Sequence, residues 1–208
     1  MNPIAKFGGF WIPPAAESDL LRLLLLSIHG GVWADSTMLC RRPLDDWLPE
    51  AFAAGFFAFA PESVDLDLPV MSSFLASLPA HPVTVQWLKS AMAHWSMEPD
   101  SRQDLGFFWV HKLFGKVVGG DDSGVPEARD IWDCVPKISG EYGVPGPHYF
   151  VPYKDHLRDQ PTPEVLDVIQ HDKETAMWKL TNHEVKLADV GTESCYRVLL
   201  RETLCHAP

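Results

Sequence analysis

Residues 18–37 have the sequence SDLLRLLLLSIHGGVWADST, and the expectations for the rest of the chain start from this stretch. Six of the seven residues from Leu20 to Leu26 are leucine. A helix this apolar has no polar face, which predicts that it lies inside the fold. Ser18 is the expected N-cap, with Asp19 in the first turn, and Gly30 is the expected left-handed residue at the C-terminal end.

Three charged residues stand out in this stretch. Asp19 and Arg22 are spaced i, i+3, so they share one face of the helix. One interpretation is an intrahelical ion pair that allows both residues to be buried. The other adds Asp35, which follows a short strand predicted as buried over residues 32–34, because sites of α/β proteins form where strands end.

Composition narrows the function classes. A chain of 208 residues with 46% hydrophobic residues suits one α/β domain. A formal net charge of −11 disfavours nucleic acid as a partner. The four cysteines lack the spacing of a zinc site, and the histidines lack the HxH or HExxH spacing of a metal-dependent hydrolase. We expect no signal peptide, because residues 1–17 lack a basic segment followed by an apolar core, and the leucine run is too short for a transmembrane segment.

The remaining elements follow from periodicity and turn residues. We expect residues 1–17 to be irregular and Ser72 or Ser73 to cap a helix. A helix over residues 103–114 would place Asp104 and His111 on one face, whereas 118–139 is expected to be a loop. The other expected elements are strands at 38–40 and 55–60 and helices at 82–97, 162–170 and 198–204.

Several segments carry a resemblance to a known family. They are SDLLRLLLLSIHGGVWADSTM, PLDDWL, GFFAFAP, MSSFLASLPAHP, DLGFFWVHKLF and MWKLTNH. In this order they resemble the capsular polysaccharide synthesis proteins and the wider group of glycosyltransferases that carry a sugar-binding DXD motif, related to the family 32 glycosyltransferases. The resemblance covers about residues 17–185 and implies an α/β, GT-A-like (Rossmann-related) fold. It also implies a turn with a short helix at 43–48 and a strand and loop over 177–183. As the alternative to a helix cap at Ser72 or Ser73, it implies a polar residue of that segment near the sugar cleft.

The resemblance also implies a domain organisation. Residues 1–208 are expected to form a single glycosyltransferase-like domain, with a lead-in over 1–17, the family-like core over 17–185 and a tail over 186–208. Family members carry a longer segment before the first helix, so we expect part of the N-terminal nucleotide-binding half to be lacking here.

Site residues carry over by position. Asp35 and Thr37 match the DXD motif in a D-x-T spelling, and they are the expected ligands of Mn²⁺ or Mg²⁺. Asp19 and Arg22 are expected to bind the donor sugar and act in catalysis, with Asp104 as a further catalytic candidate. Lys179 and His183 fall where the family faces the diphosphate, although each is as well explained as a surface residue.

The function implied is metal-dependent transfer of a sugar from a nucleotide-sugar donor to a glycan or polysaccharide acceptor, with retention. The alternative is a truncated or degenerate transferase fold that binds a sugar or a protein without turnover. The expected location is the cytoplasm, either free or peripheral to a membrane.

Overall fold

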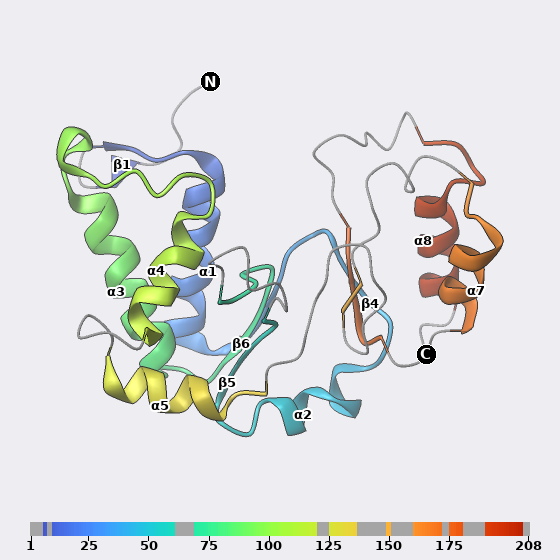
Figure 1. Cartoon of the computed structure of the whole chain (residues 1–208), viewed down its shortest axis with the longest axis horizontal. Helices are drawn as coiled ribbons and strands as arrows, with labels where there is room; N and C mark the ends of the chain where they lie inside the picture. The colour runs from blue at the N-terminus through green and yellow to red at the C-terminus, as the bar shows by residue number, and fades with distance from the viewer. Residues whose placement is uncertain are drawn as a thin grey trace. The chain divides into compact units, whose positions relative to one another are not determined.

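Two compact units make up the chain in a computed structural model, which describes residues 6–7, 10–60, 69–119, 125–136, 149–150, 160–171, 175–180 and 190–205 (Figure 1). The first unit contains Met1–Trp33 and Glu50–Lys137, and the second contains Ala34–Pro49 and Ile138–Pro208. Helices and small sheets occur in both, so the predicted α/β class is confirmed at that level. The GT-A-like arrangement and the single domain stay predictions.

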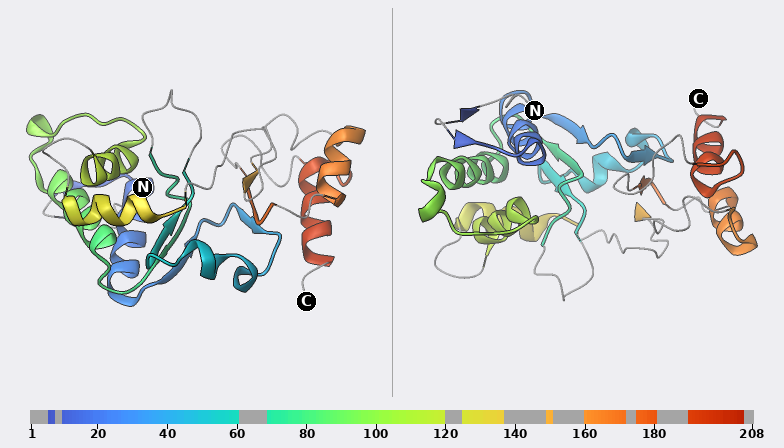
Figure 2. Two further views of the ribbon diagram at one scale, coloured as in Figure 1. Left: turned by 60° about the horizontal axis from the view of Figure 1, so that its bottom comes forward. Right: turned by 90° about the horizontal axis from the view of Figure 1, so that it is seen from above.

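The first unit is a group of helices beside a small sheet. Helix α3 lies against α1, α4 and α5, and the views in Figures 1 and 2 agree on this group. The helices are α1 (Pro14–His29), α3 (Pro82–Ser96), α4 (Trp109–Val118) and α5 (Pro126–Cys134). The sheet has the order β3 (Gly31–Ala34), β6 (Phe74–Ser77) and β5 (Phe56–Ala58), and β1 (Lys6–Phe7) pairs with β2 (Phe10–Trp11). The 3₁₀ turn η3 (Pro99–Ser101) follows α3.

Aromatic side chains fill the core of this unit. The Trp87 and Phe114 rings meet edge to face with centroids 4.6 Å apart, and Trp132 packs on Phe114 at 4.9 Å. The Trp87 indole N–H donates to the Val110 carbonyl oxygen at 2.8 Å, which satisfies the polar atom that burial of this ring removes from water. These contacts hold α3, α4 and α5 together.

Helix α1 departs from its prediction. It begins at Pro14 with Pro13 as its N-cap, so Ser18 caps nothing and Asp19 lies beyond the first turn. It contacts α3 and β6, and it also has a solvent-exposed apolar face. The side chains of that exposed face are Leu21, Leu24, Leu25 and Ile28, which are 38–57% exposed. The expectation of a helix buried on every side was therefore wrong.

The end of α1 is close to the prediction. Gly30 ends the helix at the predicted position, and its N–H donates to the Leu26 carbonyl oxygen, but its φ of +65° and ψ of −157° are not the predicted left-handed helical conformation. A Cβ at Gly30 would lie 2.6 Å from Pro79 Cδ, so glycine is needed here for space as well as for φ. Strand β3 follows as expected, but it is an edge strand with exposed residues rather than a buried one.

Other boundaries differ in ways that matter for the site. The segment predicted as a helix capped by Ser72 or Ser73 is a turn followed by strand β6. Helix α3 buries Val83, Trp87, Ala91 and Trp95. The expected loop over 118–139 contains α5, whose Trp132 is buried, and the expected irregular lead-in contains the β1–β2 hairpin.

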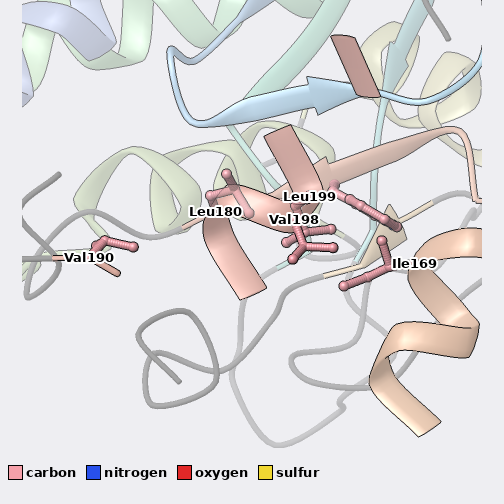
Figure 3. Packing of buried hydrophobic residues seen from close by; sticks show 6 residues of the cluster. Ile169, Leu180, Val190, Val198 and Leu199 are labelled. Atoms are coloured by element: carbon pink, nitrogen blue, oxygen red, sulfur yellow. The ribbon is translucent and has the colours of Figure 1, made fainter. Parts of the chain in front are cut away.

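The second unit has its own sheet and core. Its strands have the order β4 (Met38–Cys40), β8 (Met177–Lys179) and β7 (Tyr149–Phe150). Helices α7 (Pro163–His171) and α8 (Cys195–Cys205) lie side by side. The predicted turn and short helix are η1 (Leu44–Asp46), in this unit, and α2 (Leu48–Ala51), which crosses the boundary between the units after Pro49. Figure 3 shows the core, which consists of Ile169, Trp178, Leu180, Val190, Val198 and Leu199.

Candidate functional site

Arg22 is the centre of a buried polar cluster in the first unit. Its Nη2 lies 3.1 Å from Asp19 Oδ1, and the side chains of Arg22 and Asp19 are 7% and 14% exposed. Its Nη1 donates to the carbonyl oxygen of Ser72 at 2.6 Å and to the Ser72 hydroxyl at 3.0 Å. The guanidinium carbon lies 5.3 Å from the centroid of the Trp33 ring. The predicted ion pair therefore exists, and it is part of a larger arrangement.

The role of Ser72 as a partner of Arg22 was missed by the sequence interpretation. Ser72 and Ser73 lie in the turn before β6, both buried, and the Ser73 hydroxyl has no hydrogen-bond partner among the described residues. Local patterns do not reveal a contact across 50 residues. The chemistry of Arg22 does indicate that it needs a further partner. A guanidinium carries five N–H donors, and a single aspartate at i−3 cannot satisfy all of them.

Asp35 and Thr37 lie on a tight turn in the second unit. The Met38 N–H donates to the Asp35 carbonyl oxygen at 2.8 Å, which closes the turn before β4 begins. Residues two apart on a turn can direct their side chains to one point, as the D-x-T spelling predicts. Both side chains do reach a single cation here, and that cation is the ammonium of Lys179.

Lys179 reaches this turn from the end of β8. Its Nζ lies 3.0 Å from Asp35 Oδ2 and also donates to the Thr37 hydroxyl. Strand pairing sets Lys179 opposite Met38, and the Leu180 N–H donates to the Thr37 carbonyl oxygen at 2.8 Å. The Lys179 and Asp35 side chains are 18% and 26% exposed, so water and small solutes can reach the pair.

The donor set on this turn does not fit a divalent cation as it stands. Mn²⁺ and Mg²⁺ favour several oxygen ligands, with carboxylates prominent among them. The described residues offer one carboxylate and one hydroxyl with an ammonium between them, and no group of three or more His, Cys, Asp or Glu side chains in that part of the chain is arranged to hold a metal. The prediction of Mn²⁺ or Mg²⁺ stays a prediction, and no step below passes through a metal ion.

Asp104 is placed differently from its prediction. It lies on an exposed loop five residues before α4 begins at Trp109, so Asp104 and His111 do not share a helix face. One Asp104 carboxylate oxygen accepts from the Gly106 N–H at 2.8 Å, where Gly106 has φ +66°. His111 packs edge-on against Phe108 with ring centroids 5.6 Å apart. The catalytic role of Asp104 stays a prediction.

Two further predictions fall outside what the structure describes. His183 lies in residues 181–189, outside the described residues, so its predicted role near a diphosphate has no structural counterpart. The predicted meeting of Asp19 and Arg22 with Asp35 joins residues of different units and also stays a prediction.

Among the helices that the structure describes, we find none with the length and hydropathy to cross a bilayer.

Comparison with known proteins gives the family of the chain. The family described as "Capsular polysaccharide synthesis protein" matches residues 3–131, which is more than half of the sequence. The chain belongs to the capsular polysaccharide synthesis protein family. The part of this chain that matches the family includes Asp19, Arg22, Asp35, Thr37 and Asp104, and it ends before Lys179. The predicted resemblance is thereby confirmed.

A relative adds a similarity over a shorter span. An uncharacterized glycosyltransferase of Acanthamoeba polyphaga mimivirus is 35% identical over 69 residues, which cover 33% of this chain and 26% of the relative. The match therefore spans about a quarter of that relative's length. No solved structure matches this member of the capsular polysaccharide synthesis protein family.

Proposed function

We propose that this chain is a glycosyltransferase that moves a sugar from a nucleotide-sugar donor to a glycan or polysaccharide acceptor. Family membership and the relative named as a glycosyltransferase support this assignment. The chemistry of the Arg22 and Asp35 clusters supports it independently, because each suits one part of a nucleotide sugar.

The observation that carries the proposal is the buried polar cluster at Arg22. A sugar hydroxyl both donates and accepts hydrogen bonds, so its site needs fixed donors beside fixed acceptors. Arg22 offers donors, the Asp19 carboxylate offers acceptors, and the Ser72 hydroxyl offers both. The Ser72 contacts hold the guanidinium in one orientation, which reduces the entropy lost when a ligand binds.

The second cluster suits the diphosphate. The Lys179 ammonium is partly exposed and carries a positive charge that stabilises a phosphate oxygen. As the bond from the anomeric carbon to the donor phosphate oxygen breaks, its electron pair stays on the diphosphate. The charge that builds up there is what a fixed cation stabilises in the transition state.

Retention of the anomeric configuration is part of the proposal. The acceptor hydroxyl oxygen bonds to the anomeric carbon on the face that the diphosphate leaves, and its proton passes to the departing phosphate oxygen. The products are the glycosylated acceptor and the nucleoside diphosphate. This route needs no protein base, so Asp104 receives no role in it.

The test is release of nucleoside diphosphate from a panel of donors. The full chain would be incubated with UDP-glucose, UDP-galactose, UDP-N-acetylglucosamine and GDP-mannose, with and without Mn²⁺. We expect slow release from at least one donor, and we expect Asp19→Asn to lower that rate at least tenfold because a charged acceptor for the sugar hydroxyls is lost.

Asp167→Asn is the matched control. Asp167 also pairs with a basic residue of its own helix, His171 at 2.8 Å, but both side chains are more than 70% exposed. This variant should keep the wild-type rate. If no donor is hydrolysed or bound under any condition, the proposal is wrong. Binding without release would instead support the non-catalytic alternative.

A further inference from the structure

The Asp35 turn presents its oxygens to an ammonium where the D-x-T spelling predicts a metal ion. We propose that Lys179 is a built-in replacement for the divalent cation, so that this chain binds the diphosphate of its donor without a metal. The proposal rests on the proposed function, because it concerns the diphosphate of the same donor. Geometry, charge and support from the sheet each favour it.

The geometry is that of a shared cation. The Lys179 ammonium has three N–H donors, and in the part of the chain described here Asp35 and Thr37 account for two of them. The third can be given to a phosphate oxygen without loss of the other two. A divalent ion bound to Asp35 and Thr37 would have to displace Lys179 from both oxygens.

The charge of the Asp35 turn also matches an ammonium better than a divalent cation. Two carboxylates of a full DXD motif balance the two charges of Mn²⁺ or Mg²⁺. This turn has one carboxylate, and a hydroxyl stands in the second position, so a single positive charge is enough to balance it. Lys179 supplies that single charge at 3.0 Å from Asp35. Replacement of the second acid by Thr37 therefore matches replacement of the metal by an ammonium.

The sheet supports Lys179 well enough for a binding role. Side chains alternate between the two faces of a strand, so Lys179 points away from the core that its neighbours enter. Trp178 is fully buried and Leu180 is 3% exposed, and both belong to the core of the second unit. Arg41 stacks on Trp178 with its guanidinium carbon 4.2 Å from the ring centroid, which fixes the strand further.

Two titrations test the proposal on the full chain. Pyrophosphate binding in EDTA would be measured by calorimetry, and Mn²⁺ binding would be followed by loss of the free Mn²⁺ signal in electron paramagnetic resonance. The wild-type chain should bind pyrophosphate in EDTA and bind Mn²⁺ only weakly. Lys179→Met should weaken pyrophosphate binding about tenfold or more and strengthen Mn²⁺ binding at least tenfold.

Controls locate both effects on the turn. Adding Asp35→Asn to Lys179→Met should abolish the gained Mn²⁺ binding. Lys89→Met, which removes an exposed lysine of α3, should behave as the wild type in both titrations. Near-unchanged circular dichroism and melting temperature of Lys179→Met would show that the variant is folded, and Lys179→Arg, which keeps the charge, should retain part of the pyrophosphate affinity.

Opposite results overturn the proposal. They are wild-type Mn²⁺ binding that Asp35→Asn abolishes, or pyrophosphate binding that is undetectable in EDTA and appears with Mn²⁺. The proposed function fails separately. It fails if no nucleotide sugar is bound or hydrolysed with or without metal, whereas a hydrolysis rate that depends on Mn²⁺ leaves the transferase in place and removes only the role given to Lys179.

Discussion

Two of the acid–base pairs among the described residues, Asp19–Arg22 and Asp35–Lys179, differ in almost every physical respect. Asp19 and Arg22 lie three residues apart on one helix, are buried, and are held by Ser72. Asp35 and Lys179 lie 144 residues apart, come together through strand pairing, and are partly exposed. A buried pair is held in one arrangement because breaking it leaves a charge without water, whereas an exposed pair can exchange partners at low cost.

This difference suggests a division of roles. The Arg22 cluster has the rigidity that recognition of a neutral, hydroxyl-rich sugar requires, because hydrogen bonds select it only when donors and acceptors are fixed. The Lys179 cluster has the accessibility that capture of an anion requires.

Arg22→Met should have the largest effect on stability. It leaves the Asp19 carboxylate buried beside an apolar side chain and removes a donor from the Ser72 carbonyl oxygen. Breaking a buried pair in this way costs about 3–5 kcal/mol, which for a chain of this size lowers the melting temperature by roughly 10 °C. Thermal unfolding followed by circular dichroism measures it.

Arg201→Met is the control for that variant. Arg201 lies 4.0 Å from Glu202, and its side chain is 55% exposed. Its loss should change the free energy of unfolding by no more than about 0.5 kcal/mol. Adding Asp19→Asn to Arg22→Met should recover part of the loss, because the buried charge is then removed. A loss below 1 kcal/mol for Arg22→Met alone would contradict the view that this pair is locked in place.

Gly30→Ala should give the next largest loss of stability, because Gly30 connects α1 to β3. A Cβ there would lie 2.7 Å from Pro79 N and 2.8 Å from the Ser77 carbonyl oxygen, at φ +65°. Conformational strain and overpacking together should cost roughly 3 kcal/mol. Gly31→Ala is the matched control, since φ is +93° but nothing lies within 4 Å of the new Cβ. Equal losses in urea unfolding for the two variants would show that space at Gly30 is unimportant.

These residues also show what the sequence could predict. The helix, its end at Gly30 and the strand after it follow from local spacing, and the resemblance to the DXD-type family implies that Asp35 and Thr37 share one cation. The identity of that cation follows from neither, because Lys179 arrives from 142 residues away through pairing of β8 with β4. Ser72 was assigned to a helix cap for the same reason, because its contact with Arg22 is set by packing.

The prediction that α1 is buried on every side was wrong for a different reason. Six leucines show that a helix is apolar, but they do not show how many neighbours it has. The buried side chains of α1, which are Ala16, Arg22, Leu23 and Leu26, do not include Leu24 and Ile28, and these two remain exposed. The predicted helix over 103–114 was wrong at its start, because α4 begins at Trp109. Asp104 therefore lies in a loop, where its carboxylate accepts a hydrogen bond from the Gly106 N–H.

Lys179→Met should change stability much less than Arg22→Met does. An ion pair that is partly exposed contributes at most about 1 kcal/mol, and the melting temperature should therefore fall by no more than a few degrees. Differential scanning calorimetry of the two variants side by side measures the contrast. A loss as large as that of Arg22→Met would mean that Lys179 is a structural residue and would remove the contrast between the two pairs.

Lowering the pH should reduce the stability of the first unit, and this is the smallest effect that we predict. Burial lowers the pKa of His94, and the charges of Arg102 and Lys116 lower it further, while burial lowers the pKa of His81. The folded chain then binds fewer protons than the unfolded chain below about pH 6.5, the ordinary pKa of histidine, so stability is lost as the pH falls through that range. Melting temperatures at pH 7.5 and 5.5 measure the loss, which should be smaller in His94→Gln. An unchanged loss in that variant would show that His94 is not a cause.

The most direct test of the account compares two ligands with two variants. Affinities for a nucleoside diphosphate and for its sugar conjugate, such as UDP and UDP-glucose or GDP and GDP-mannose, would be measured in EDTA for the wild type, Asp19→Asn and Lys179→Met. We predict that Asp19→Asn weakens binding of the sugar conjugate alone, whereas Lys179→Met weakens binding of both ligands by about the same factor, tenfold or more. Equal weakening of both ligands by Asp19→Asn, or full affinity for both in Lys179→Met, would contradict the roles assigned to the two clusters.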